Sequence, residues 1–418
     1  MRAALVGVDV VRERVDVLVV VLGAVLHRDF DADVALDALH GDDLGLGAGE
    51  FRAVLGGFDG GLVPRERADV ADDAVLVEVG LVLLGVLVVI SIFSMFMSNT
   101  ATAAMFLAFL APVFASLPDT DAKGKVGIAL AIPIAANVGG IGTPIGTPPN
   151  AIAVGALQNA GYTITFGGWM AHMVPYMLIM LLIAWGLLLF FFPFKSDKIE
   201  LHIPVQNRKM DAKAWIAWIT FFATILLWVT ESLTGINSNI VALIPVAIYT
   251  MTGVFTSDDL KEIDWSVLWL VAGGFALGTG LEETGLAQTM IHAIPFEQMN
   301  VVLVIVIAGL VCYGLSNFIS NSATAALLIP IMVVVGHAME DPTAANHEVF
   351  AAAGGMDTLI PFVAICASLA MILPISTPPN AIAASTKMVT TAQMAKVGVL
   401  IGIIGFALAY FMFTKIAF

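Results

Sequence analysis

Residues 97–105 read MSNTATAAM, and residues 319–327 read ISNSATAAL. Each stretch places three polar residues, 98–100 or 320–322, inside an apolar run. Polar groups buried among apolar ones cost free energy unless they find partners. An apolar chain that carries the same polar insert twice is therefore expected to use both copies for one purpose.

The composition indicates a membrane protein. The 418 residues are 59% hydrophobic and 12% charged, with a mean hydropathy of +0.95, whereas soluble domains carry about 25% charged residues. Residues 79–118 and 126–194 contain no Asp, Glu, Lys or Arg, and about 20 apolar residues suffice to cross a bilayer. The histidines show no metal-ligand spacing, and no nucleotide-binding glycine loop occurs. We predict an all-α polytopic membrane protein that contacts lipid, binds no nucleic acid and is not an enzyme.

Residues 1–89 form an anomalous low-complexity segment. They use eleven residue types and lack Ile, Lys, Ser, Thr, Asn, Gln, Cys, Trp and Tyr, which occur only from Ile90 onward. The pattern of a secretory signal peptide is not recognisable. A wrong reading frame or start is favoured over a charged cytoplasmic extension. If the segment is native, the chain would instead read as a degenerate, inactive copy.

The remaining chain divides into two modules and a linker. The first module, 90–194, contains a helical hairpin, a broken helix and a span. The second module, 213–418, contains a second hairpin at 301–339 and a second broken helix at 358–391. The basic linker, 195–212, is assigned to the cytoplasm by the positive-inside rule. Further spans are expected at 169–193, 213–232, 239–255, 265–280 and 396–416.

Both modules contain a Thr-Pro-Pro-Asn segment after the hairpin. It occurs in GTPPNAIA (146–153) and in STPPNAIA (376–383), which are separated by 230 residues, whereas the polar triplets are separated by 222. A helix cannot continue through this segment, because proline lacks an N–H and restricts the residue before it. The freed carbonyls can bind a hard cation, and the restarted helix offers N–H groups to an anion.

The two copies are expected to have opposite orientations. Five crossings separate the hairpins, and an odd number inverts the second copy. Loop charges place the first hairpin opening toward the cytoplasm and the second opening outward, with the 340–357 loop outside. We therefore predict an inverted-repeat transporter with two re-entrant hairpins and two broken helices, which meet near the membrane midplane.

These motifs resemble the divalent anion:sodium symporter family, from about residue 91 to residue 418. The resemblance implies a fold like that of the ion transporter superfamily, a homodimer, and residence in the inner membrane of a prokaryote. It also implies two sodium sites that flank one anion site. The second triplet departs from the family pattern, because it is Ser-Asn-Ser. The sodium ligands implied are Ser94, Ser98, Asn99, Gly146, Ser316, Ser320, Asn321 and Ser376. The substrate contacts implied are Asn99, Thr100, Thr147, Pro148, Asn321, Ser322, Thr377 and Pro378.

The residues themselves favour coupling to Na⁺. Neither pair of motifs contains a basic residue or a carboxylate, and an unpaired charge at membrane depth is costly. Co-bound sodium would offset a dianion such as succinate, malate or fumarate, so sodium-coupled import of a C4-dicarboxylate is the expected function. The alternatives are a sodium-independent dicarboxylate or citrate exchanger of the same fold, a sulfate symporter, and a membrane enzyme or channel.

Overall fold

The computed structural model describes residues 75–118, 121–195, 198–201, 211–261, 265–286, 289 and 299–415. Most of the anomalous segment, residues 1–74, lies outside them. The described chain is mostly helical, which confirms the helical class. Within the described residues, four helices are long and apolar enough to cross a membrane. They are α9 (Phe166–Phe191), α10 (Ala212–Val229), α16 (Asn321–Glu340) and α20 (Thr391–Lys415).

Helices in the first module break at the positions that the polar motifs predict. The first described helix, α4, begins at Val79, where the charge-free run begins, and passes through the compositional change at Ile90. Asp121 caps a later helix by accepting a hydrogen bond from Gly124 N at 3.1 Å, as is usual for Asp at an N-cap. The helices are α4 (Val79–Ser94), α5 (Asn99–Phe109), α6 (Ala111–Ser116), α7 (Ala122–Gly140) and α8 (Pro148–Asn159).

The second module shows the same order of breaks. A helix ends at Ser316, the next begins at Asn321 within the second triplet, and a short helix begins at Pro378. The remaining helices are α11 (Glu231–Thr234), α12 (Ser238–Thr252), α13 (Trp265–Glu283), α15 (Val301–Ser316), α17 (His347–Ala352), α18 (Gly355–Ser368) and α19 (Pro378–Ser385), with a 3₁₀ turn η2 (Asp259–Lys261). Strands β1 (Val75–Glu78) and β2 (Lys198–Leu201) pair antiparallel, with Val75 opposite Leu201.

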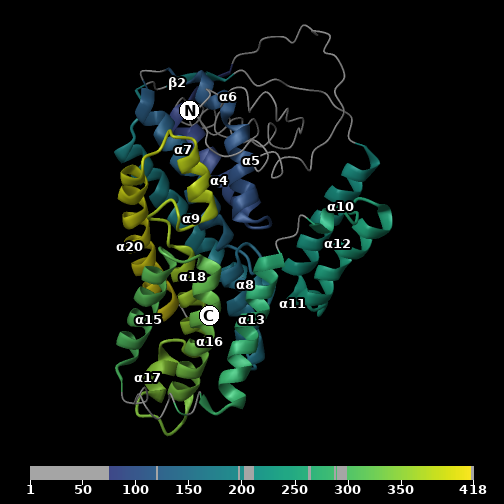
Figure 1. Cartoon of the computed structure of the whole chain (residues 1–418), viewed down its shortest axis with the longest axis vertical. Helices are drawn as coiled ribbons and strands as arrows, with labels where there is room; N and C mark the ends of the chain where they lie inside the picture. Colours follow the sequence, from purple (N-terminus) through teal and green to yellow (C-terminus); the bar gives the residue numbers. More distant parts are fainter. Residues whose placement is uncertain are drawn as a thin grey trace, which may run out of the picture.

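The core of the protein consists of helices from both modules. Helix α4 packs on α7 and α15 packs on α18, and the modules meet where α5 packs on α19 and α8 packs on α16. Helices α7 and α18 are buried along almost their whole length. In Figure 1, α10 and α12 lie side by side apart from this core. Their large apolar side chains, such as Phe222 and Leu243, are more than half exposed, as expected for surfaces that face lipid.

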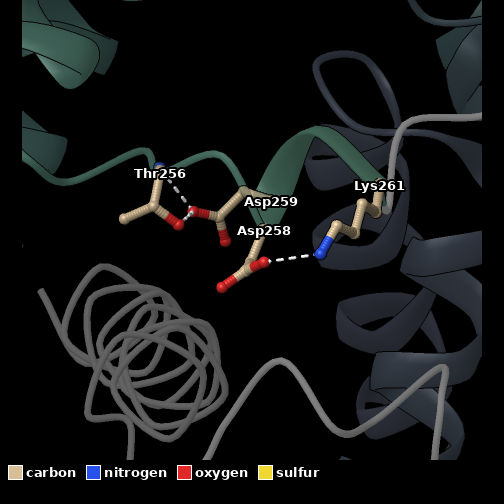
Figure 2. A network of polar contacts seen from close by, with 4 residues as sticks. All are labelled: Thr256, Asp258, Asp259 and Lys261. Carbon is tan, nitrogen blue, oxygen red and sulfur yellow. Dashed lines mark hydrogen bonds and ion pairs between the residues drawn. The ribbon is translucent and has the colours of Figure 1, made fainter.

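A small polar network follows α12 (Figure 2). Asp259 accepts hydrogen bonds from the hydroxyl and the backbone N–H of Thr256, and these bonds lower the pKa of the Asp259 carboxyl. Lys261 Nζ lies 2.7 Å from Asp258 Oδ1, with both side chains strongly exposed. Exposed ion pairs of this kind contribute little to stability. The network shapes a surface turn and is distant in sequence from both polar motifs.

Close packing of α4 on α7 gives a testable prediction. A Cβ added to Gly139 would lie 2.5 Å from Ser91 Cα, whereas nothing lies within 4 Å of a Cβ added to Gly186 in α9. We expect Gly139→Ala to destabilise the protein by about 1–3 kcal/mol, because two backbones must separate. Gly186→Ala should be neutral or slightly stabilising, because Ala favours a helix by about 1 kcal/mol. Thermal unfolding midpoints in detergent measure both effects, and equal midpoints would contradict the packing.

Candidate functional site

The first half of the candidate site begins between α4 and α5. Ser98 caps α5, and its Oγ accepts a hydrogen bond from Ala101 N at 3.2 Å. Serine is favoured at this position because its short side chain reaches an N–H that has no partner within the helix. The turn therefore brings Ser94, the last residue of α4, next to Asn99, the first residue of α5.

Oxygen atoms surround one end of the Asn99 carboxamide. Its terminal atom lies 2.7 Å from Ser94 Oγ, 3.1 Å from the Ala136 carbonyl oxygen and 3.2 Å from the Gly146 carbonyl oxygen. With the amide nitrogen at this position, Asn99 donates hydrogen bonds to the three oxygens. With the amide oxygen there, it and the three other oxygens form one cluster of neutral oxygens, the type of ligand that a hard cation prefers. Rotation of this one amide exchanges the two arrangements.

Two glycines allow the backbone to enclose Asn99. A Cβ on Gly140 would lie 2.5 Å from Asn99 Oδ1, and a Cβ on Gly146 would lie 2.3 Å from the Gly140 carbonyl oxygen. A side chain at Gly146 would clash with the backbone of Gly140, and one at Gly140 would displace the Asn99 amide. Gly140 ends α7, and Gly146 lies in the segment before α8. The predicted ligand Gly146 is thus adjacent to Ser94 and Asn99.

Buried side chains hold the segment between α7 and α8 in place. Nδ2 of Asn150 donates to the carbonyl oxygens of Gly140, Ile141 and Thr143 at 3.0, 3.2 and 2.8 Å. Trp169 Nε1 also donates to the Ile141 oxygen, at 3.1 Å. Non-helical backbone at membrane depth is tolerated when it is buried in protein and its polar groups have partners. Asn150 supplies these partners from within the Thr-Pro-Pro-Asn motif itself.

The second half repeats these contacts. Ser316 Oγ lies 2.7 Å from Asn321 Oδ1 and donates to the Ala367 oxygen at 2.9 Å. Ser320 caps α16 by accepting from Ala323 N at 3.2 Å. Asn380 Nδ2 donates to the Met371 and Leu373 oxygens at 2.9 and 3.0 Å. The second copy therefore folds locally as the first does, and Ala367 occupies the place of Ala136.

The two halves differ at Asn317, which occupies the place of Met95. Asn317 Oδ1 accepts a hydrogen bond from Ile372 N at 3.1 Å, and its Nδ2 donates to the Tyr313 oxygen at 2.8 Å. Ser376 Oγ donates to the Asn317 carbonyl oxygen at 3.0 Å and accepts from Leu373 N at 3.1 Å. The hydroxyl of the predicted ligand Ser376 is thus hydrogen-bonded to the protein.

The structure brings the predicted residues of both modules together. Helix α5 packs on α19, and α8 packs on α16, so each triplet lies beside a helix that begins at the other module's Thr-Pro-Pro-Asn segment. Ser98 and Ser320 use their hydroxyls as helix caps. Among the predicted residues, Ser94, Gly146, Thr147, Ser316, Ser376 and Thr377 are buried, Asn99, Pro148, Asn321 and Ser322 are half-buried, and Ser98, Thr100, Ser320 and Pro378 are exposed.

The sequence reasoning missed several residues that shape the site. Ala136, Ala367 and Asn317 were not predicted, and Ala136 and Ala367 act through carbonyls that no sequence pattern identifies. The roles of Asn150 and Asn380 were within reach, because the repeated motif ends in Asn. No group of three or more His, Cys, Asp or Glu side chains that could hold a metal ion occurs in the described part of the chain.

A further contact between the modules lies at the other end of α8. The hydroxyl of Tyr162 donates to Glu340 Oε2, at the C-terminal end of α16. Burial and this hydrogen bond raise the pKa of Tyr162. The tyrosine therefore stays protonated and fastens the loop after α8 to the second module.

Comparison with known proteins identifies the family of the chain. The citrate transporter family, CitMHS, matches residues 77–355. The chain belongs to this family. The predicted resemblance to the divalent anion:sodium symporters is confirmed, because sodium-dependent dicarboxylate transporters are among its relatives. The chain is thus similar to transporters, and the family model that it matches is that of a citrate transporter.

Three relatives illustrate the range of similarity. An uncharacterized transporter of Haemophilus influenzae is 31% identical, over 74% of this chain and 67% of that protein. The low-affinity phosphate transporter PHO90 of Saccharomyces cerevisiae is 31% identical, over 65% of this chain and 31% of that protein. The sodium-dependent dicarboxylate transporter SdcS of Staphylococcus aureus is 28% identical, over 77% of this chain and 66% of that protein. The matches thus span about two thirds of the two bacterial relatives and about a third of the yeast one.

The support that Asn150 gives to the segment before α8 can be tested. We expect Asn150→Ala to lower the unfolding midpoint strongly, because three carbonyl groups lose a shared donor, and a buried polar group without a partner costs about 1–3 kcal/mol. Asn159→Ala, which removes an exposed side chain at the end of the same helix, should change the midpoint little. Thermal unfolding in detergent compares them. A stable Asn150→Ala protein would show that the three hydrogen bonds contribute nothing.

Proposed function

We propose that this protein imports a divalent anion together with sodium ions by secondary active transport. The favoured substrate is a C4-dicarboxylate such as succinate, malate or fumarate. The observation that carries the proposal is the convergence of Ser94 Oγ and the Ala136 and Gly146 carbonyls on Asn99, with matching contacts of Ser316, Asn321 and Ala367. Site residues keep the roles that the family resemblance implies.

The cation argument rests on the chemistry of these ligands. Neutral hydroxyl, amide and carbonyl oxygens suit a hard cation that binds without removing a proton. A proton carrier would instead need a group that titrates, and neither pair of motifs contains a carboxylate or a histidine. The amide of Asn99 presents its nitrogen to the carbonyls without a cation and its oxygen with one. The second half offers Ser316 Oγ, Asn321 Oδ1 and the Ser376 carbonyl oxygen.

The anion argument rests on helix ends. Helices α5, α8, α16 and α19 all begin at the motifs, and α5 and α16 each pack on a helix of the other module. The first turn of a helix carries N–H groups without helical partners and a partial positive charge, so it attracts anions. The first residues of these helices include the predicted substrate contacts Asn99, Pro148, Asn321 and Pro378. Two sodium ions would neutralise a dianion held there.

The names of the relatives support both parts of the proposal and add a second substrate. The staphylococcal relatives are named sodium-dependent dicarboxylate transporters. The yeast relatives are named phosphate transporters, so inorganic phosphate is the second candidate anion. Each sodium ion that enters along a membrane potential supplies about 2.3 kcal/mol per 100 mV, so a third ion per cycle would help to concentrate the anion.

The inverted repeat and the re-entrant hairpins belong to the same proposal. The two modules repeat the same hydrogen bonds, as an internal repeat requires, and the loop charges support opposite orientations. A prokaryotic inner membrane and a homodimer remain predictions from the family resemblance.

Uptake into proteoliposomes tests the proposed function. We expect an inward sodium gradient to drive accumulation of radiolabelled succinate, with a sigmoidal dependence on sodium because more than one ion binds. Citrate, sulfate and phosphate are tested as competitors. Uptake that runs equally well when choline replaces sodium would reject the symporter and favour an exchanger.

The pairing of the two halves predicts the effect of two amide deletions. Asn99→Ala and Asn321→Ala should each abolish sodium-driven uptake, because each removes a ligand from one half of the site. Asn159→Ala, on an exposed face of α8, serves as the matched control and should transport normally. Gel-filtration profiles in detergent establish that all three variants are folded. Normal uptake by either amide variant would show that the corresponding half of the site is not needed for transport.

Opposite orientation of the modules is tested by labelling cysteines in intact cells. Ala345 and Ala122 are both exposed, and the native Cys312 and Cys366 are buried. Ala345→Cys should react with a membrane-impermeant maleimide added outside, because the 340–357 loop is predicted to be external. Ala122→Cys should react with the maleimide only after the cells are permeabilised. The same response from both positions would overturn the predicted topology.

A further inference from the structure

Asn137 joins the two modules through direct side-chain contacts. It lies in α7 and is 1% exposed. Its Nδ2 donates to Thr377 Oγ1 at 3.1 Å and lies 3.4 Å from Asn380 Oδ1. Both acceptors belong to the second module, 240 and 243 residues away. A buried polar contact over such a distance in sequence fixes how the modules meet.

The position of Asn137 along α7 places it beside the first cluster of oxygens. The preceding residue, Ala136, provides the carbonyl that accepts from Ser94 and faces Asn99. Consecutive residues of one helix move together, because the helical hydrogen bonds fix their geometry. If changes around Ala136 shift α7, the amide of Asn137 therefore moves as well.

The acceptors of Asn137 define the start of α19. Thr377 is the N-cap, and its Oγ1 accepts a hydrogen bond from Asn380 N at 3.3 Å. Asn380 also holds the Met371 and Leu373 carbonyls through its Nδ2. The Asn137 amide thus contacts the two side chains that set the first turn of α19 and the segment before it.

No reciprocal contact occurs among the described residues. The matching bonds of Ser94 to Ala136 and of Ser316 to Ala367 make Ser368 the equivalent of Asn137. Ser368 is 2% exposed, and its hydroxyl has no hydrogen-bond partner in the described structure. Asn150, which ends the first motif as Asn380 ends the second, also has no partner there for its Oδ1. Thr147 makes no side-chain cap bond to α8. The shorter serine does not provide the link that Asn137 provides.

We propose that Asn137 is a positioning residue that couples cation binding in the first module to anion binding at the start of α19. The inference rests on the proposed function. A cation among Ser94, Asn99 and the Ala136 carbonyl draws these oxygens together and favours one placement of α7. In that placement the Asn137 amide holds Thr377 and Asn380 in the arrangement that binds the anion. The coupling free energy therefore passes through this amide.

The experiment compares Asn137→Ala with Ser368→Ala as the matched control at the equivalent position. Purified proteins are titrated with radiolabelled succinate, or with phosphate, at low and at saturating sodium. The ratio of the two anion Kd values gives the coupling factor. Sodium binding without anion is measured by thermal shift. A merely structural role would change sodium binding and stability but would leave the coupling factor unchanged.

We expect wild type and Ser368→Ala to bind the anion more tightly in saturating sodium than in low sodium. In Asn137→Ala the coupling factor should fall about fivefold or more, while the affinity for sodium stays unchanged. Asn137→Leu, which has the same branching at Cγ and no N–H to donate, replaces Asn137→Ala if that variant does not fold. An Asn137 variant with wild-type coupling, or equal loss in Ser368→Ala, would overturn this inference alone. A wild-type protein whose anion binding ignores sodium would reject the proposed symport, and this inference with it.

Discussion

The structure depends on one constraint: backbone that leaves a helix inside an apolar body must find hydrogen-bond partners. Both Thr-Pro-Pro-Asn segments break a helix, and in each the Asn at the end of the motif donates to two or three of the freed carbonyls. The prolines break the helix, and the asparagine provides hydrogen-bond donors for the carbonyls that the break exposes. Carbonyls that these bonds leave free, such as that of Gly146, then become available to an ion.

The same constraint explains why the site is neutral. Serine, threonine and asparagine satisfy local backbone groups without carrying a charge whose burial would be costly. Ser98 and Ser320 stabilise helix ends, whereas Ser94 and Ser316 connect those ends to the broken helices. A site of this kind acquires charge from its ligands. This accounts for the link between cation and anion binding in the proposed function.

The two halves are alike in their local folding and differ in how they are fixed. In the second half, Asn317 holds the segment before α19, and Asn137 reaches across from the first module. In the first half, Met95 occupies the place of Asn317. Ser368 of the second module follows Ala367 as Asn137 follows Ala136, and its hydroxyl has no hydrogen-bond partner in the described structure. The segment before α19 is therefore held by both modules, whereas Asn150, Trp169 and Thr143, all of the first module, hold the segment before α8.

Sequence alone determined the helical class, the helix breaks and most of the candidate site. Apolar runs with embedded SNT and TPPN motifs give these features directly, because proline and N-cap chemistry act over a few residues. Tertiary structure decided which backbone carbonyls complete the oxygen clusters and which side chains cross between modules. The Ala136 carbonyl and the Asn137–Thr377 bond depend on how α7 packs against α4 and α19. Such contacts join residues far apart in the chain, and backbone carbonyls are present at every residue, so no local pattern identifies them.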